Sequence, residues 1–244
     1  TKDVDIPYFV QKKIGNHYLL LMAEGGSDYN HAVTALTAKS LWGPYVPCTI
    51  NPVLTHRHLG KDYPVQSLGH ADLVQTPTGD WYAVFLGKRI VEGGLVPLGR
   101  ETFLCEVSFQ NGEPIFNPGI GVIGNRLKRP LLPWTPVSKT DKQNDFESSA
   151  LSPEWATMRI PEQPLHHFAD GNLFLSLRPE MADSLVCPSM LLHRVHSHNF
   201  SAITTMTFST CQANEWAGLV LYRTAKGYYS LLKGKNEIRL TIDK

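Results

Sequence analysis

Residues 73–83 read LVQTPTGDWYA and decide the fold class. A short apolar run ends at the turn sequence Pro77-Thr78-Gly79-Asp80, and a second run follows it directly, which is the pattern of a β-hairpin. Further short strands separated by Gly- and Asn-rich turns are predicted at residues 17–22, 80–86 and 102–109. The best helical candidate, residues 34–41, is only two turns long. The chain is therefore predicted to be mostly β.

A change in composition divides the chain into two parts. Residues 126–146 contain Pro130, Pro133 and Pro136 with basic residues and no alternation, as expected of a linker. Residues 1–125 precede it as one β domain, and residues 147–244 follow it as another. In the second domain, strands are predicted at residues 155–159, 173–177, 203–208, 218–222, 228–232 and 238–242. Short strands at such spacing favour a β-sandwich.

Composition excludes several classes of protein. The 244 residues carry 23 Lys and Arg against 22 Asp and Glu, a balance that disfavours a binder of nucleic acid or of anionic membranes. No apolar run approaches the roughly 18 residues of a membrane helix. The four cysteines form no C-x-x-C pair, so a zinc ribbon is disfavoured, while two disulfides and free buried thiols both stay open. We expect an extracellular location.

Several motifs, taken in order, carry a resemblance to a known family. They are Ala23-Glu24-Gly25-Gly26-Ser27, Asn51-Pro52-Val53-Leu54-Thr55, Gly69-His70-Ala71-Asp72-Leu73-Val74, Leu98-Gly99-Arg100-Glu101-Thr102, Leu151-Ser152-Pro153-Glu154-Trp155 and Glu215-Trp216-Ala217-Gly218. Together they resemble glycoside hydrolase family 43, in particular its β-xylosidases and α-L-arabinofuranosidases with an appended C-terminal β-sandwich. The implied architecture is all-β: part of a five-bladed β-propeller followed by a jelly-roll-like sandwich.

The resemblance implies inverting hydrolysis of a terminal pentose in xylan or arabinoxylan. A general acid protonates the leaving oxygen while a carboxylate base activates water. In the family the base and a third carboxylate lie upstream of the first motif found here, so we expect a chain truncated at both ends. Asp5 is the candidate general acid. At about 40–50 residues per blade, residues 1–125 supply between two and three blades.

Five residues are candidates for the sugar site. The resemblance places Arg100 as a sugar-contacting guanidinium, the alternative being an ion pair with Glu101. It places His70 at the centre of the propeller channel, where it could hold a carboxylate or ligate calcium; a core or surface histidine is the alternative. Glu24 lines the pocket from a strand end or is a turn carboxylate. Asp72 and Glu101 are expected to support these groups rather than to be catalytic.

Three functions stay open. The first is hydrolysis of xylo- or arabino-oligosaccharides without a required cofactor. The second is a non-catalytic, lectin-like carbohydrate-binding protein, and the third is a structural protein that kept only the scaffold. Because an incomplete propeller leaves blade faces and strand edges unpaired, we also expect a complementary chain or self-association.

Overall fold

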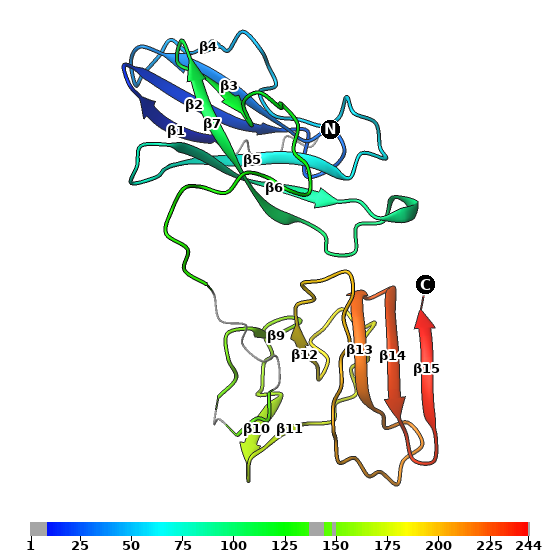
Figure 1. Ribbon diagram of the computed structural model, residues 1–244. Helices are drawn as coiled ribbons and strands as arrows, with labels where there is room; N and C mark the ends of the chain where they lie inside the picture. Colours follow the sequence, from blue (N-terminus) through cyan, green and yellow to red (C-terminus); the bar gives the residue numbers. More distant parts are fainter. Residues whose placement is uncertain (1–8, 137–143, 148–149, 244) are drawn as a thin grey trace. The chain divides into compact units, whose positions relative to one another are not determined.

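A computed structural model describes residues 9–136, 144–147 and 150–243 (Figure 1). Its contacts divide the chain into two compact units, residues 1–136 and 137–244. The described residues contain strands and one 3-10 turn, η1 (Glu92–Gly94), and no helix with the length and apolar character of a membrane span. The mostly-β prediction is confirmed.

The first unit consists of two four-stranded antiparallel sheets. The strands of the first sheet are β1 (Phe9–Ile14), β2 (His17–Glu24), β3 (Ala32–Ala38) and β4 (Val46–Pro47). Those of the second sheet are β5 (Val65–Gln75), β6 (Trp81–Arg89), β7 (Glu101–Gln110) and β8 (Glu113–Phe116). In each sheet the strands neighbour one another in chain order, which is the arrangement of a propeller blade.

The predicted hairpin is the β5–β6 turn. Leu73 lies opposite Ala83, and Thr76 and Gly79 close the turn through backbone hydrogen bonds. Gly79 has φ +93°, a conformation that glycine adopts without a Cβ penalty. Turn chemistry thus fixes the register of β5 against β6.

The core of this unit lies between the two sheets, because β5 packs against β2 and β3. Leu19 and Leu21, two apart on β2, are 0% and 1% exposed, as period-2 alternation requires. Leu68 and Phe85 are buried from the second sheet. The buried face therefore holds the two blades together through hydrophobic contact.

The helix expected at residues 34–41 is wrong, because this segment lies mostly in β3. Leu21 on β2 pairs with Ala35, and Tyr18 pairs with Ala38. The β-branched residues Val33, Thr34 and Thr37 favour the pleated conformation. Pairing along the whole length of β2 overrides a weak local helical signal.

The second unit contains several small antiparallel sheets. β9 (Trp155–Thr157) pairs with β12 (Leu191–His193), β10 (His166–Ala169) with β11 (Asn172–Leu175), and β13 (Ala217–Thr224), β14 (Gly227–Lys233) and β15 (Ile238–Asp243) form one sheet. The strand expected at residues 203–208 does not form, and Ile203 is 93% exposed. An apolar, β-branched composition gives no strand where no neighbouring strand pairs with it.

All four cysteines are free thiols. Burial raises the pKa of the Cys48 thiol to about 11 and that of Cys105 to about 12. Both therefore act as small core residues rather than as reactive groups.

Candidate functional site

The turn between β2 and β3 is held by two cations from the second sheet. Arg100, directly before β7, donates from Nη1 to Ser27 Oγ over 3.3 Å, and Lys88 on β6 donates from Nζ to the Ser27 carbonyl over 2.6 Å. Gly25 has φ +77°, and a Cβ there would collide with the Asn30 carbonyl. The glycines of the Ala23–Ser27 motif thus allow a turn tight enough to present Ser27 to both cations.

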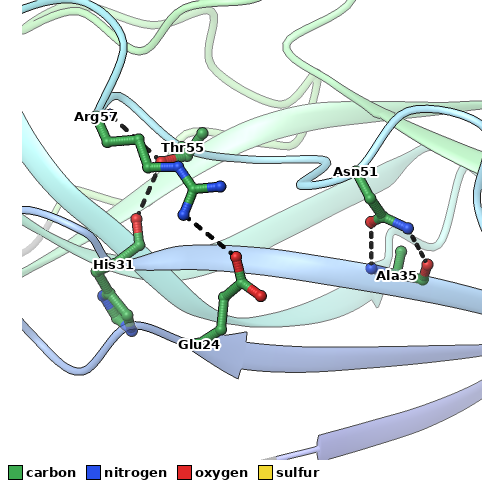
Figure 2. Close-up of polar contacts among 6 residues, drawn as sticks. All are labelled: Glu24, His31, Ala35, Asn51, Thr55 and Arg57. Atoms are coloured by element: carbon green, nitrogen blue, oxygen red, sulfur yellow. Dashed lines mark hydrogen bonds and ion pairs between the residues drawn. The ribbon is translucent and has the colours of Figure 1, made fainter.

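The same turn contacts the loop that follows β4, as Figure 2 shows. Arg57 Nη1 lies 3.4 Å from Glu24 Oε1, and Thr55 Oγ1 donates to the His31 carbonyl over 3.1 Å. The ion pair is more than one-third exposed on both sides, so it contributes about 1 kcal/mol or less to stability. Glu24, at the end of β2, is therefore a carboxylate with a cationic partner.

Asn51 fixes the position of this loop. Its side-chain amide accepts from the Ala35 amide and donates to the Ala35 carbonyl, each over 2.8 Å (Figure 2). It also donates to the Cys48 carbonyl over 3.2 Å. The side chain thus imitates a neighbouring strand at the edge of β3. It thereby brings Thr55 and Arg57 to the β2–β3 turn.

β5 is irregular where it carries His70. Its register against β6 shifts between Gln66 and Gly69 and again between Gly69 and Asp72. Ser67 has φ +56° and His70 has φ +57°, conformations that cost non-glycine residues on the order of 1–3 kcal/mol each. Such bulges redirect side chains at functional sites. His70 is exposed although its neighbours Gly69 and Ala71 are buried.

His31 packs beneath this segment. It is 3% exposed, and its Nδ1 lies 3.0 Å from the Ser67 carbonyl. Burial lowers its pKa, and the positive charges of His70, Lys88 and Arg100 lower the pKa further. His70, Lys88 and Arg100 each act electrostatically on His31, and we call these four residues the cation cluster. The roles of Arg100 and His70 in sugar binding stay predictions.

Asp72 and Glu101 have partners of their own. Asp72 Oδ1 lies 3.3 Å from Lys12 Nζ on β1 and accepts from the Leu73 amide over 2.7 Å. Glu101 accepts three hydrogen bonds of 2.6–3.1 Å from Arg89 on β6, which raise the pKa of Arg89. Asp72 therefore links β5 to β1 of the other sheet, and Glu101 links β7 to its neighbour β6.

The structure leaves two predictions of the sequence untested, the general acid and the calcium ion. Asp5 lies outside the described residues. Calcium takes about 6–8 oxygen ligands, but within residues 9–136, 144–147 and 150–243 no group of three His, Cys, Asp or Glu could hold a metal ion. A calcium ion at His70 stays a prediction.

A surface hollow of about 350 Å³ lies elsewhere, at the β14–β15 turn, and is lined by Lys233 to Ile238. It contains none of the predicted site residues. Beside it, Arg239 stacks on Trp216 at 4.2 Å, which occupies an aromatic face that a sugar would need. The cation cluster is the better candidate.

The sequence did not single out His31, Lys88 or Arg57. Ser27 was quoted in a motif but given no role. His31 follows that motif by four residues and Arg57 follows the Asn51–Thr55 motif by two. Their roles depend on contacts between the two sheets and between turn and loop, which spacing along the chain does not show.

Comparison with known proteins places this geometry in a family. Residues 5–114 match the model of glycosyl hydrolases family 43, and residues 143–242 match that of the β-xylosidase C-terminal concanavalin A-like domain. The chain belongs to glycoside hydrolase family 43. Its two four-stranded sheets are accordingly blades of the family's β-propeller, and its second unit is part of the appended β-sandwich.

The curated relatives that this chain matches are longer than it is. It is 36% identical to the xylosidase/arabinosidase of Butyrivibrio fibrisolvens, over 94% of this chain and 45% of that protein. It is also 36% identical to the non-reducing end α-L-arabinofuranosidase BoGH43B of Bacteroides ovatus, over 93% of this chain and 42% of that protein. The chain spans less than half the length of these two relatives.

Solved structures agree. The Bacteroides ovatus xyloglucan-locus GH43B superposes with a TM-score of 0.80 at 33% identity, over 97% of this chain and 47% of that one. Xylan β-1,4-xylosidase of Bacillus halodurans superposes with a TM-score of 0.82 at 27% identity, over 99% of this chain and 48% of that one.

Proposed function

We propose that this chain forms part of a glycoside hydrolase that releases terminal pentoses from xylan or arabinoxylan, as a β-xylosidase or an α-L-arabinofuranosidase. The observation that carries the proposal is the contact of Arg100 with Ser27, in a chain of family 43 in which Arg100 and His70 both act electrostatically on the buried His31. The names of the relatives, which include xylosidases and arabinofuranosidases, support the same substrate class.

The cation cluster suits a polyhydroxylated ligand. The guanidinium of Arg100 offers forked donors to adjacent hydroxyls, and the ammonium of Lys88 and the imidazole of His70 add further donors. The same positive charges stabilise nearby carboxylates in their ionised form. An inverting enzyme needs one ionised carboxylate as the base that activates water. We therefore assign Arg100 and His70 to sugar binding and to the orientation of such a base.

A specific observation supports a second candidate, carbohydrate binding without hydrolysis. Each of the three predicted carboxylates in the described residues has a cationic partner: Glu24 with Arg57, Asp72 with Lys12 and Glu101 with Arg89. A carboxylate occupied in this way is not poised to take a proton from water. Asp5 remains the candidate general acid.

One experiment separates the two candidates. The purified protein is incubated with p-nitrophenyl β-D-xylopyranoside and with p-nitrophenyl α-L-arabinofuranoside, and its melting temperature is measured with and without D-xylose or L-arabinose. A ligand that binds only the folded state must raise that temperature. Release of nitrophenol supports the hydrolase, and a thermal shift without release supports the binding protein. If nitrophenol is not released and the melting temperature does not rise at high sugar concentration, both candidate functions are contradicted.

The role of Arg100 is tested in the same assays with Arg100→Met. Arg129→Met is the matched control, because Arg129 is an arginine of the same unit that stacks on Trp134 instead. We expect Arg100→Met to reduce nitrophenol release or the thermal shift and Arg129→Met to leave both unchanged. Equal loss in the two variants would contradict the assignment.

A further inference from the structure

The irregular segment of β5 from Ser67 to His70 packs against the buried side chain of His31. His31 comes from the first sheet, directly before β3, and its Nδ1 lies 3.0 Å from the Ser67 carbonyl. Its own carbonyl accepts from Thr55 Oγ1. The backbone of His31 is thus held by the loop, and its imidazole is held by β5.

Gly69 and the His31 ring are complementary in shape. A Cβ built on Gly69 would lie 2.5 Å from His31 Nδ1 and closer still to Cε1 and Nε2. The backbone of Gly69 is not in the left-handed region, so conformation does not require glycine there. The requirement comes from the ring, which lies directly against the glycine.

These contacts link His31 to the direction of His70. Gly69 is the residue at which both register shifts of β5 meet, and His70 follows it with φ +57°. A strand in regular register would alternate its side chains between the two faces. The bulged conformation places His70 at the surface, and a group that holds the bulge also sets the direction of that side chain.

We propose that His31 is a positioning residue, which holds the bulged Ser67–His70 segment of β5 by packing on Gly69 and by hydrogen bonding to Ser67, and so sets the orientation of His70. The importance of that orientation for sugar binding rests on the function proposed above. The structural part, the dependence of His70 on His31, does not.

The structural part is tested by NMR of the histidine ring resonances, with the His70 signals assigned by their loss in His70→Gln. His31→Leu removes the hydrogen bond to Ser67 at similar volume, whereas His31→Asn keeps an amide donor close to the position of Nδ1. We expect the His70 resonances to shift in His31→Leu and to return toward their native positions in His31→Asn. Phe116→Leu, a core change on the outer strand β8, is the matched control and should leave them unchanged.

A second measurement remains informative if His31→Leu fails to fold. Gly69→Ala should lower the melting temperature, because its methyl group collides with the imidazole. The same change in a His31→Ala background should lower it much less, because the ring is gone. Equal decreases in both backgrounds, or native His70 resonances in His31→Leu, would overturn the proposal.

Sugar affinity then distinguishes this inference from the proposed function. If both hold, His31→Leu weakens pentose binding by about tenfold, as the loss of one coupled contact would, and His31→Asn restores part of it. If the His70 resonances shift but the native protein binds no pentose, the proposed function fails and the positioning role stands.

Discussion

The hydroxyl of Ser27 lies 3.3 Å from Nη1 of Arg100, while the Ser27 carbonyl accepts from Lys88 Nζ over 2.6 Å. One small residue in a glycine turn therefore contacts two cations of the neighbouring sheet, one on β6 and one directly before β7. This relationship joins the two blades at the proposed sugar site, and it is the basis of the first prediction.

Ser27→Ala removes the contact to Arg100 and leaves the backbone contact to Lys88. We expect pentose affinity to fall several-fold, because Arg100 loses its orienting acceptor, with a change in unfolding free energy of about 1 kcal/mol or less for an exposed hydrogen bond. Calorimetric titration and urea unfolding measure the two effects. A variant with native affinity would show that Arg100 needs no help from Ser27.

The second prediction concerns acid stability and His56. This histidine is 1% exposed; its Nε2 accepts from the Ile123 amide over 3.0 Å, so its proton lies on Nδ1, which donates to the Val65 carbonyl over 2.6 Å. Burial lowers its pKa below the ordinary 6.5, and the neighbouring His58 lowers it further. Protonation of Nε2 would break the bond to Ile123 and bury a charge.

Because the pKa of His56 is lower in the folded than in the unfolded state, its neutral form stabilises the fold fully above pH 6.5. We expect the unfolding free energy, from urea titrations between pH 8 and pH 5, to decrease as the pH falls below that value. His31 acts in the same direction, since burial lowers its pKa too. His56→Gln should lower the stability at pH 8 and flatten the pH dependence, whereas His198→Gln, at an exposed site, should do neither. A native slope in His56→Gln would contradict the assignment.

The third prediction concerns the Arg89–Glu101 pair. Glu101→Gln should lower the unfolding free energy by about 1 kcal/mol, because the pair is bidentate yet partly exposed. A double-mutant cycle with Arg89→Met isolates the coupling between the two side chains. Loss of all sugar binding in Glu101→Gln at native stability would instead indicate that Glu101 contacts the ligand directly.

The fourth prediction concerns Asn51, whose amide makes two hydrogen bonds to Ala35 and one to Cys48. Asn51→Ala should destabilise the protein by about 1–3 kcal/mol, because the Ala35 amide loses its acceptor, whereas the Ala35 carbonyl still accepts from the Cys48 amide. Asn172→Ala, which removes one exposed hydrogen bond to the Asp170 carbonyl, is the control and should cost a few tenths of that. A similar small loss in both would show that the loop holds its place without Asn51.

The sequence predicted the hairpin at residues 73–83 correctly because turn chemistry and flanking strands agree there. The helix predicted at residues 34–41 was wrong because the segment is short and its strand conformation depends on pairing with β2. The strand predicted at residues 203–208 was wrong for the opposite reason, because the segment has a strand-like composition but pairs with no other strand. In both cases a non-local hydrogen-bond partner decided the outcome.

The candidate site shows the same division. Arg100 and His70 stand in motifs, and both act electrostatically on His31. His31 and Lys88 act through backbone groups of Ser67 and Ser27, and backbone acceptors leave no mark in the sequence. The partners of Glu24, Asp72 and Glu101 lie 33, 60 and 12 residues away along the chain, on other strands or loops, so no local pattern indicates them.

The most direct test of the central claim, that Arg100 and its neighbours form a pentose site, is calorimetric titration of D-xylose and L-arabinose into the native protein, Arg100→Met and Arg129→Met. We expect the native protein and Arg129→Met to bind one of these pentoses with the same affinity and Arg100→Met to bind it at least about tenfold more weakly, because a charged hydrogen bond is lost. Binding of equal strength by all three proteins, or by none of them, would contradict it.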